Sequence, residues 1–235
     1  MLLALKRALR RFGYDVVRYH PLFDLVLQKY AIDTVLDIGA NDGQFALEIH
    51  EKLPHAAIYS FEPLHDAYQK LMERMRRVPG FHAFNIGLGE AAATATIHRS
   101  SFSPSSSLLP MAALHKKLYP KSAEATPETI TLKRLDDIQD ELPQSGNLLV
   151  KLDVQGYEDK VLRGGSAVIA RAKVLITEAS YVTLYEGQPL FDDIYTVARE
   201  LGFIYAGSRE RHYSPATGEL IYEDALFVRD EAARR

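Results

Sequence analysis

Residues 34–50, "TVLDIGANDGQFALEIH", decide the fold of this chain, because they run from a strand through a turn into a helix. The apolar run 34–38 predicts a buried strand that carries Asp37 near its end, and a helical pattern follows over 43–52. The glycines Gly39 and Gly43 allow a tight turn and let the backbone approach a ligand closely. The first N–H groups of the helix then face whatever binds there. The stretch therefore predicts a ligand-binding βα unit, with a plain βα turn as the alternative.

The spacing of the glycines indicates which ligand fits. The pattern is D-x-G-x-x-x-G, in which Asn41 replaces the middle glycine that lets a pyrophosphate approach a dinucleotide loop. Asp37 would repel a phosphate but suits a cation. S-adenosyl-L-methionine (AdoMet) meets both conditions, because it carries a sulfonium and no phosphate. We therefore expect AdoMet at this loop rather than a nicotinamide dinucleotide.

Two further strand ends carry residues suited to the rest of that cofactor. Glu62 and Pro63 follow the apolar run 57–61 in "FEP", and a carboxylate there can accept hydrogen bonds from both ribose hydroxyls. Asn85, in "FNIGLG" near the end of a predicted strand over 81–88, is expected within reach of the adenine. A solvated carboxylate or helix cap remains the alternative for Glu62, and ordinary turn chemistry remains the alternative for Asn85.

Strand and helix patterns alternate along the chain, which predicts an α/β domain with a mostly parallel sheet and helices on both faces. Further strands are predicted over 94–98, 129–133, 148–152, 174–177, 203–206 and 220–228, and further helices over 65–77, 157–162 and 191–201. The last strand is expected at an edge of the sheet, antiparallel to its neighbour. The segment 101–128 is rich in Ser and Pro and is too long for a simple connection, so it is interpreted as a lid, a binding loop or a disordered segment.

Composition narrows the classes of function. The chain has 235 residues, 47% hydrophobic and 25% charged, which suits one globular domain. A net charge of −3 gives no general attraction to nucleic acid, so no nucleic-acid partner is expected. The absence of cysteine excludes a disulfide framework, a thiolate nucleophile and a Cys-ligated zinc, and it fits a cytoplasmic protein.

The first residues predict an amphipathic helix, because Leu2, Leu5, Leu9 and Phe12 recur at helical spacing with basic residues between them. A secretory signal is rejected, since the basic residues follow the short apolar run instead of preceding a long one. We expect a helical extension over 1–30 and the cofactor-binding domain over 31–235. The helix packs on the domain or on a partner, or alternatively residues 1–20 make peripheral contact with a membrane surface.

The motifs together resemble the FkbM family of AdoMet-dependent methyltransferases, over about residues 33–228. The motifs that carry the resemblance are "VLDIGANDGQF", "FEP", "FNIGLG", "SPSSSL", "ITLKRLDD", "VKLDVQGYEDKVLRGG" and "LITEASYVTLYEGQP". The first three are shared by many methyltransferases, whereas "KLDVQGYE" followed by a strand that ends in Glu178 is more specific. The resemblance implies a Rossmann-like class I methyltransferase fold with a seven-stranded sheet. It also implies O-methylation of hydroxyls on sugars, glycolipids or polyketide-type products.

Carried over position by position, the resemblance assigns a cofactor set and a second acidic element. Asp37, Gly39, Ala40, Asn41, Gly43, Glu62, Pro63 and Asn85 fall on the cofactor side, while Asp153 and Glu158 fall on the D-x-x-G-x-E element. Gln155 departs from the family, many of whose members carry Glu there. That difference weakens the case for a metal site built from carboxylates, and we expect no metal.

Methyl transfer to a hydroxyl calls for an aligned acceptor and a general base within hydrogen-bond reach. Asp153 and Glu178 end two adjacent strands, so either can be the base, with a helix cap and a strand-end ion pair as their alternatives. Glu158 is assigned to the first turn of a helix. Lys151 shares the face of Asp153 and is expected to pair with it. Lys151, Ser106, Ser107 and Tyr181 are candidate acceptor-binding residues, with loop and packing roles as alternatives.

These observations predict a cytoplasmic AdoMet-dependent O-methyltransferase. The expected acceptor is a hydroxyl-bearing carbohydrate or a glycosylated small molecule. A small natural product or a lipid is the alternative acceptor. A non-catalytic subunit with the same fold, acting as a partner in glycan assembly, is the alternative from a different class.

Overall fold

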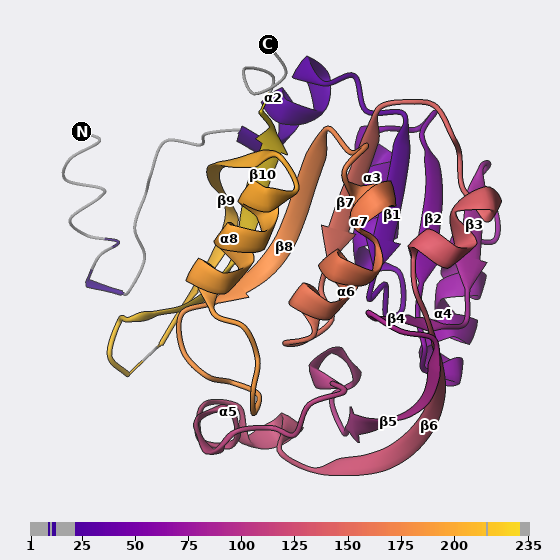
Figure 1. Ribbon diagram of the computed structural model, residues 1–235. Coiled ribbons are helices and arrows are strands. Elements are labelled where there is room, and N and C mark those ends of the chain that lie inside the picture. The colour runs from indigo at the N-terminus through magenta and orange to yellow at the C-terminus, as the bar shows by residue number, and fades with distance from the viewer. Residues whose placement is uncertain (1–8, 10, 13–21, 215, 231–235) are drawn as a thin grey trace.

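The computed structural model describes residues 9, 11–12, 22–214 and 216–230, and its centre is a seven-stranded sheet (Figure 1). The strand order is β3-β2-β1-β7-β8-β10-β9. The bounds are β1 (Thr34–Ile38), β2 (Ala57–Phe61), β3 (Phe81–Phe84), β7 (Leu148–Leu152), β8 (Val174–Ser180), β9 (Phe203–Tyr213) and β10 (Leu220–Arg229). The strands from β3 to β8 in this order are parallel, and β10 is antiparallel to both of its neighbours. This arrangement confirms the predicted α/β fold with a mostly parallel sheet.

Helices cover both faces of the sheet because neighbouring residues of each strand point to opposite sides. In β7, Leu149 packs with α2 (Leu22–Lys29), α3 (Gln44–Lys52) and α4 (His65–Met75). Leu148 and Val150 pack on the other side, with α6 (Glu158–Gly164), α7 (Ser166–Ile169) and α8 (Phe191–Glu200). A strand buried on both faces reads as a continuous apolar run, as 148–150 does.

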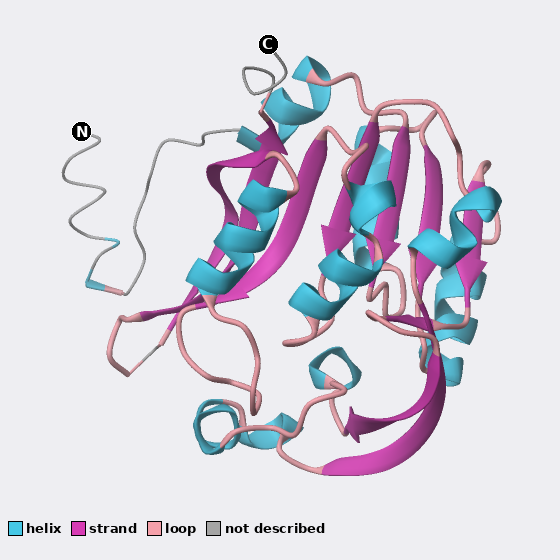
Figure 2. Cartoon of the chain, in the orientation of Figure 1, coloured by secondary structure: helices cyan, strands magenta, loops and turns pink. Residues whose placement is uncertain are grey.

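A second, three-stranded sheet lies below the carboxyl ends of the parallel strands (Figure 2). It consists of β4 (Gly87–Leu88), β6 (Ala125–Lys133) and β5 (Ala93–Ser100), in this order. Between β5 and β6 the chain forms the short helices η1 (Ser103–Ser105), α5 (Ala113–Leu118) and η2 (Pro120–Ser122); η3 (Asp136–Glu141) leads back toward β7. The segment 101–128 is therefore folded, and of its three interpretations disorder is wrong.

Three expected strands differ from the structure in their extent, their partners or their place in the sheet. The single strand expected over 81–88 is divided between the two sheets, because the chain turns at Asn85 and Ile86. The strand expected over 129–133 pairs with β4 and β5 and not with the main sheet. The last strand, β10, is not an edge: it lies between β8 and β9, and the edge is β9. The reason is burial, since the second half of β10 is buried throughout while β9 is largely half-exposed or exposed.

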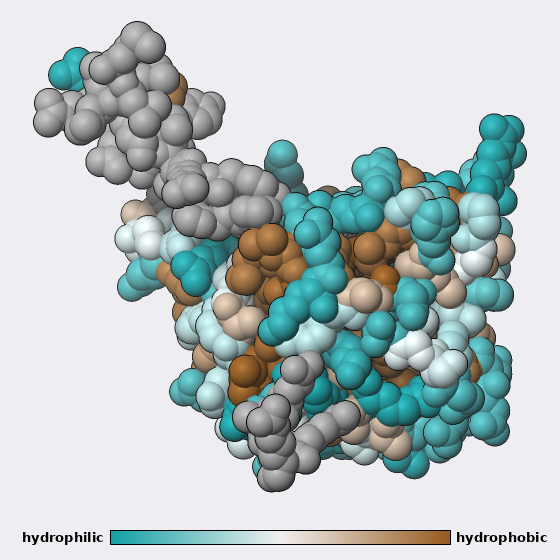
Figure 3. Space-filling model, turned by 90° about the horizontal axis from the view of Figure 1, so that it is seen from above, coloured by the Kyte–Doolittle hydropathy of each residue, from teal (hydrophilic) through white to brown (hydrophobic). Residues whose placement is uncertain are grey.

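The predicted helix over residues 1–12 lies almost entirely outside the described residues. The described end of the expected extension, α2, contributes Phe23, Val26 and Leu27 to the core between the sheet and α3. Figure 3 shows the face at the amino ends of the parallel strands, where hydrophobic residues gather among hydrophilic ones. Within the described residues, no helix has both the length and the apolar character needed to cross a membrane.

Candidate active site

A cleft of about 410 Å³ lies between the carboxyl ends of the main-sheet strands and the second sheet with residues 102–108, here called the serine segment. Open α/β sheets bind ligands at this edge. One end of the cleft is apolar and the other is acidic. The apolar end is lined by Ile86, Leu88, Ile97, Leu108 and Ile130, and the acidic end by Asp153, Glu178, Glu210 and Asp224.

The glycine loop packs directly on the loop that follows β7. Gly39 has φ +78°, and a Cβ at this position would lie 1.9 Å from the backbone oxygen of Asp153. The N–H groups of Gly39 and Ala40 both donate to the carbonyl of Phe61, at 3.0 Å each. Only glycine allows this approach, so the backbone at Gly39 packs directly against the backbone carbonyl of Asp153.

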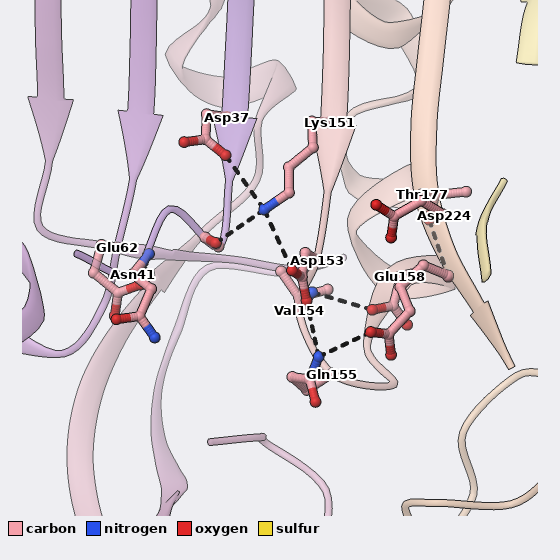
Figure 4. A network of polar contacts seen from close by, with 12 residues as sticks. Asp37, Asn41, Glu62, Lys151, Asp153, Val154, Gln155, Glu158, Thr177 and Asp224 are labelled. Atoms are coloured by element: carbon pink, nitrogen blue, oxygen red, sulfur yellow. Dashed lines mark hydrogen bonds and ion pairs between the residues drawn. The ribbon is translucent and has the colours of Figure 1, made fainter. Parts of the chain in front are cut away.

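Asp37 lies beneath this loop and not in the cleft lining, which differs from its expected cofactor contact. It is 0% exposed, and in the register of β1 and β7 its partner is Lys151. Lys151 Nζ lies 3.4 Å from Asp37 Oδ1 and 3.4 Å from Asp153 Oδ2, and it donates to the Gly39 carbonyl at 3.2 Å (Figure 4). Burial raises the pKa of Asp37, and the Lys151 charge opposes this shift. Lys151 thus joins the strand, the loop and Asp153, as expected for the Lys151–Asp153 pair.

Glu62 lines the cleft beside the glycine loop, as its predicted role requires. Its two carboxylate oxygens accept hydrogen bonds from the backbone N–H groups of Asn41 and Leu64, both at 2.8 Å. The side chain is 5% exposed, and burial raises the pKa of Glu62 to about 7 against these two hydrogen bonds. Each oxygen keeps a second acceptor position, which is what a pair of ribose hydroxyls would use.

Gly43 and Asn85 do not line the cleft, although both were expected to contact the cofactor. Gly43 lies against α4, where a Cβ would be 2.7 Å from Leu71 Cδ1. The Asn85 amide donates to the carbonyls of Glu62 and Pro63, at 2.9 and 3.0 Å. Both residues support the cleft without lining it. Gly43 permits close packing of α3 on α4, and Asn85 fixes the "FEP" turn by its hydrogen bonds.

Asp153 and Glu178 lie at the acidic end and are joined by the side chain of Gln155. Figure 4 labels Asp153 and Gln155 in this arrangement. The Gln155 amide nitrogen donates to Asp153 Oδ1 at 2.8 Å and to Glu178 Oε2 at 3.2 Å. Its amide oxygen accepts a hydrogen bond from the Tyr185 hydroxyl at 2.7 Å. In the sequence, Gln155 stands out only as a lost carboxylate, whereas in the structure it is the neutral bridge between two acids.

The two acids differ in environment. The Asp153 side chain is 40% exposed and faces Lys151. Burial first, and then the charges of Asp153, Glu158 and Asp224, raise the pKa of Glu178 well above its ordinary value. The protonated form of Glu178 is therefore favoured relative to that of an exposed glutamate. Such a division between neighbouring carboxyl groups is how active sites separate an acid from a base.

Glu158 is buried at the start of α6 and supports the turn that carries Gln155. Its Oε1 accepts hydrogen bonds from the N–H groups of Val154 and Gly156, at 3.1 and 3.2 Å. Burial raises the pKa of Glu158 to about 7. Gln155 itself has φ +55°, an uncommon conformation for a non-glycine residue, so this turn is under strain that the Glu158 contacts offset. The structural role assigned to Glu158 matches this geometry.

The serine segment covers the cleft from the other side. Ser106 and Ser107 both line it. The Ser107 hydroxyl donates to the Gln155 carbonyl at 2.6 Å, and the Ser106 hydroxyl accepts from the Ser100 N–H at 3.0 Å. Asn41 Nδ2 reaches the Ser103 hydroxyl at 3.3 Å across the cleft. These contacts favour the binding-loop interpretation of this segment.

Tyr181 lies away from the cleft, so the structure does not place it with the other acceptor candidates. Its ring stacks on Phe191, with 5.1 Å between centroids. Other residues, which the sequence motifs do not indicate, line the acidic end: Arg209, Glu210 and His212 of β9, and Tyr222 and Asp224 of β10. Asp224 lies opposite Glu178 in the register of β8 and β10. The acidic residues in the apolar run of β10 were a signal, but only the strand pairing shows where they point.

The residues present fit AdoMet. Glu62 keeps free acceptor positions for a ribose, the apolar end suits an adenine, and Gly39–Asn41 bring bare backbone to the cleft. The acidic end suits a ligand that carries a sulfonium and an ammonium. Across the described residues, no group of three or more His, Cys, Asp or Glu is arranged to hold a metal ion.

Residues 37–205 match the family described as the methyltransferase FkbM domain, so the chain belongs to the FkbM methyltransferase family. It is therefore a methyltransferase, and the family together with the fold implies the use of AdoMet. The strand order agrees, with an antiparallel pair that completes an otherwise parallel sheet.

Two named relatives and one solved structure are examples of the similarity. The 2-O-methyltransferase NoeI of Sinorhizobium fredii is 26% identical over 80% of this chain and 82% of its own length. The hexuronic acid methyltransferase AglP of Haloferax volcanii is 32% identical over 70% of this chain and 61% of its own. An rRNA methylase of Streptococcus thermophilus is 9% identical and aligns with 91% of this chain and 99% of its own, at a TM-score of 0.47.

Proposed function

We propose that this protein transfers a methyl group from AdoMet to a hydroxyl of a sugar or of a glycosylated molecule. The observation that carries the proposal is the Asp153–Gln155–Glu178 arrangement, which puts a solvent-accessible carboxylate and a half-buried carboxyl group in the same cleft as the glycine loop and Glu62. AdoMet supplies an electrophilic methyl group when it is bound. The protein would hold the cofactor, align the acceptor hydroxyl with the methyl group, and accept the proton that the hydroxyl loses.

Three parts of the chain would hold the cofactor. Glu62 would accept hydrogen bonds from the ribose hydroxyls, the apolar end would enclose the adenine, and residues 39–41 would follow the methionine side. The Asp153 backbone packs against Gly39, so the acid stands beside the part of the cleft where the transferable methyl is expected. This proximity is the main rate advantage that such a site provides.

The two carboxyl groups suit different tasks. Asp153 is accessible and flanked by Lys151, and we assign it as the general base that takes the proton from the acceptor hydroxyl as the methyl–oxygen bond forms. Glu178, whose pKa is raised by burial and by neighbouring carboxylates, suits donating a hydrogen bond that orients the acceptor. Lys151 cannot serve as the base, because Asp153 and Asp37 raise its pKa above the ordinary value despite burial.

The assignment to sugar hydroxyls is supported by the relatives. One is named for 2-O-methylation and the other for hexuronic acid methylation. The acidic end of the cleft is called the acceptor end below, because the proposed acceptor would bind there. It is rich in hydroxyl and carboxyl groups, including those of Ser106, Ser107 and Tyr222. Groups of this kind recognise polyhydroxylated ligands by hydrogen bonding.

The proposal is tested by incubating the purified protein with AdoMet and a panel of glycosides. The expected result is demethylated cofactor together with an O-methyl sugar, whose mass and methylation position are read by mass spectrometry and NMR. Calorimetry with AdoMet is run in parallel. Tight cofactor binding with transfer only to non-sugar hydroxyls would exclude the sugar assignment, and no cofactor binding would favour the scaffold alternative.

Glu62 makes a specific pH dependence of cofactor binding testable. Its carboxylate form would accept hydrogen bonds from both ribose hydroxyls. With a pKa of about 7, only a minor fraction of Glu62 is ionised at pH 6. AdoMet affinity is therefore expected to rise about tenfold between pH 6 and 8, with proton release on binding. Isothermal titration in two buffers of different ionisation enthalpy measures both effects.

The matched control is Glu62→Gln, which removes the titration. The variant should bind more weakly and lose most of the pH dependence, which separates Glu62 from the cofactor's own amino group. The same raised pKa acts on the free fold: the stability contribution of Glu62 decreases as pH rises from 4.5 to about 7 and stays low above that. An equal pH dependence in wild type and variant would rule out this role.

A further inference from the structure

The acceptor end of the cleft is dominated by carboxyl groups. Beyond Glu62, its carboxyl-bearing lining residues are Glu48, Asp153, Glu178, Glu210 and Asp224, against the two basic residues Lys151 and Arg209. They come from α3, β7, β8, β9, β10 and the loop after β7, so the whole end shares this character. Whether an anionic acceptor can bind therefore depends on whether either cation is available.

Lys151 is already engaged. Its ammonium lies 3.4 Å from Asp37 and 3.4 Å from Asp153, and it donates to the Gly39 carbonyl at 3.2 Å. The side chain is only 12% exposed. These three contacts match the three donors of an ammonium group. A carboxylate on the acceptor would have to displace one of them.

Arg209 is engaged as well. Its guanidinium lies 2.6 Å from Glu48, 2.8 Å from Asp224 and 3.2 Å from Glu210. The Arg209 side chain is 16% exposed, and its guanidinium lies over the Phe45 ring, 5.6 Å from the centroid. A guanidinium recognises an anion best through a free two-donor edge, and here both terminal nitrogens face carboxylates.

The remaining wall offers aromatic surface. His212 and Tyr222 both line the cleft, and their rings stack with 4.3 Å between centroids and 16° between planes. The His212 Nε2 atom is directed toward Glu210, at 3.9 Å from its Oε2. This wall therefore offers ring faces and polar edges, which suit an uncharged sugar.

From this arrangement we infer that the enzyme selects acceptors that are uncharged around the methylated hydroxyl and rejects those that carry a carboxylate, sulfate or phosphate there. The inference rests on the proposed function and adds the charge class of the substrate to it. An anion brought to this end meets several carboxylates in a partly buried site, and each cation of the lining is held by carboxylates of the protein itself. Desolvating an anion without a partner is unfavourable.

The test is a competition between a matched pair of glycosides, a methyl hexoside and the corresponding methyl hexuronide, in one reaction with AdoMet. The sugar scaffold is the one that the glycoside panel identifies. We expect kcat/KM for the neutral sugar to exceed that for the hexuronide by about tenfold or more, since like charges a few ångströms apart repel strongly in a partly buried site. The difference should shrink as NaCl is raised, because salt screens the repulsion.

A charge-reversal variant makes the test specific to this site. Glu210→Lys places a cation at the half-exposed rim of the acceptor end, and it should shift the hexuronide-to-hexoside ratio upward by about tenfold. The matched control is Glu200→Lys, which makes the same change of charge on exposed α8, outside the cleft lining. This control should leave the ratio unchanged.

The outcomes separate the two levels of the proposal. Hexuronide methylation by the wild type at an equal or higher rate overturns the charge inference while the proposed function stands. An equal ratio in Glu210→Lys and Glu200→Lys also overturns it. Methylation of neither sugar, with AdoMet bound, counts against the proposed function itself.

Discussion

Replacing Asp153 with asparagine is expected to lower kcat by about two to four orders of magnitude, the usual contribution of a general base. Asparagine keeps the size of the side chain and can still present an oxygen to the Gln155 amide, so the turn after β7 should persist. It cannot take the proton from the acceptor hydroxyl. AdoMet affinity should change by less than about threefold, because the cofactor's ribose and adenine contacts lie elsewhere in the cleft.

The control is Asp159→Asn, which removes a carboxylate from the first turn of the nearby helix α6, outside the cleft lining. Asp159 lies near Lys160 and Arg163 and does not line the site. Single-turnover kinetics and cofactor titration on both variants separate chemistry from binding. Near-normal kcat in Asp153→Asn would remove Asp153 from the mechanism. If the corresponding Glu178→Gln variant were then inactive, the base would be Glu178.

Gly39→Ala is expected to abolish measurable AdoMet binding and to lower the free energy of unfolding by several kcal/mol, on the order of a severe core change. The added Cβ would lie 1.9 Å from the Asp153 carbonyl oxygen, a backbone atom that no side-chain rotation can move. The glycine loop and the loop after β7 would have to separate. That separation would break the Lys151 contact to the Gly39 carbonyl as well.

Gly218→Ala is the matched control, because it isolates the cost of the backbone conformation. Gly218 has φ +73°, close to the +78° of Gly39, but a Cβ there meets nothing within 4 Å. This variant should lose only about 1 kcal/mol of stability and keep its cofactor affinity. Urea unfolding and calorimetry on both variants measure the difference. Equal losses in the two variants would show that the contact with Asp153 is unimportant.

Much of the fold was predictable from local patterns. The alternation of apolar strands with amphipathic helices indicated the α/β class, and the bounds of β1, β2 and β7 were predicted to the residue. The edge assignment of the last strand was wrong, because strand order depends on which of two antiparallel strands buries more of its surface. That property is decided by pairing and not by either sequence alone.

The candidate site also contains residues that the sequence indicates and residues that only the fold brings there. Gly39, Glu62 and Asp153 are placed at the cleft by strand ends, and strand ends are recognisable in sequence. Asp37 and Gly43 sit in the same recognisable loop but face inward, since a loop has an inner and an outer side that a motif does not distinguish. Arg209 and Asp224 come from the antiparallel pair, far from the motifs, and only the sheet brings them to the acceptor end.

By itself, the sequence determined that this chain is an α/β methyltransferase with a glycine loop, a strand-end glutamate and an acidic element, because each is a local pattern with a local physical reason. The tertiary structure alone decided that Gln155 bridges two acids, that Lys151 and Arg209 are held by carboxylates of the protein, and that the acceptor end is acidic. These properties depend on distances between segments far apart in the chain. Electrostatic and hydrogen-bond energies follow those distances, and no local pattern specifies them.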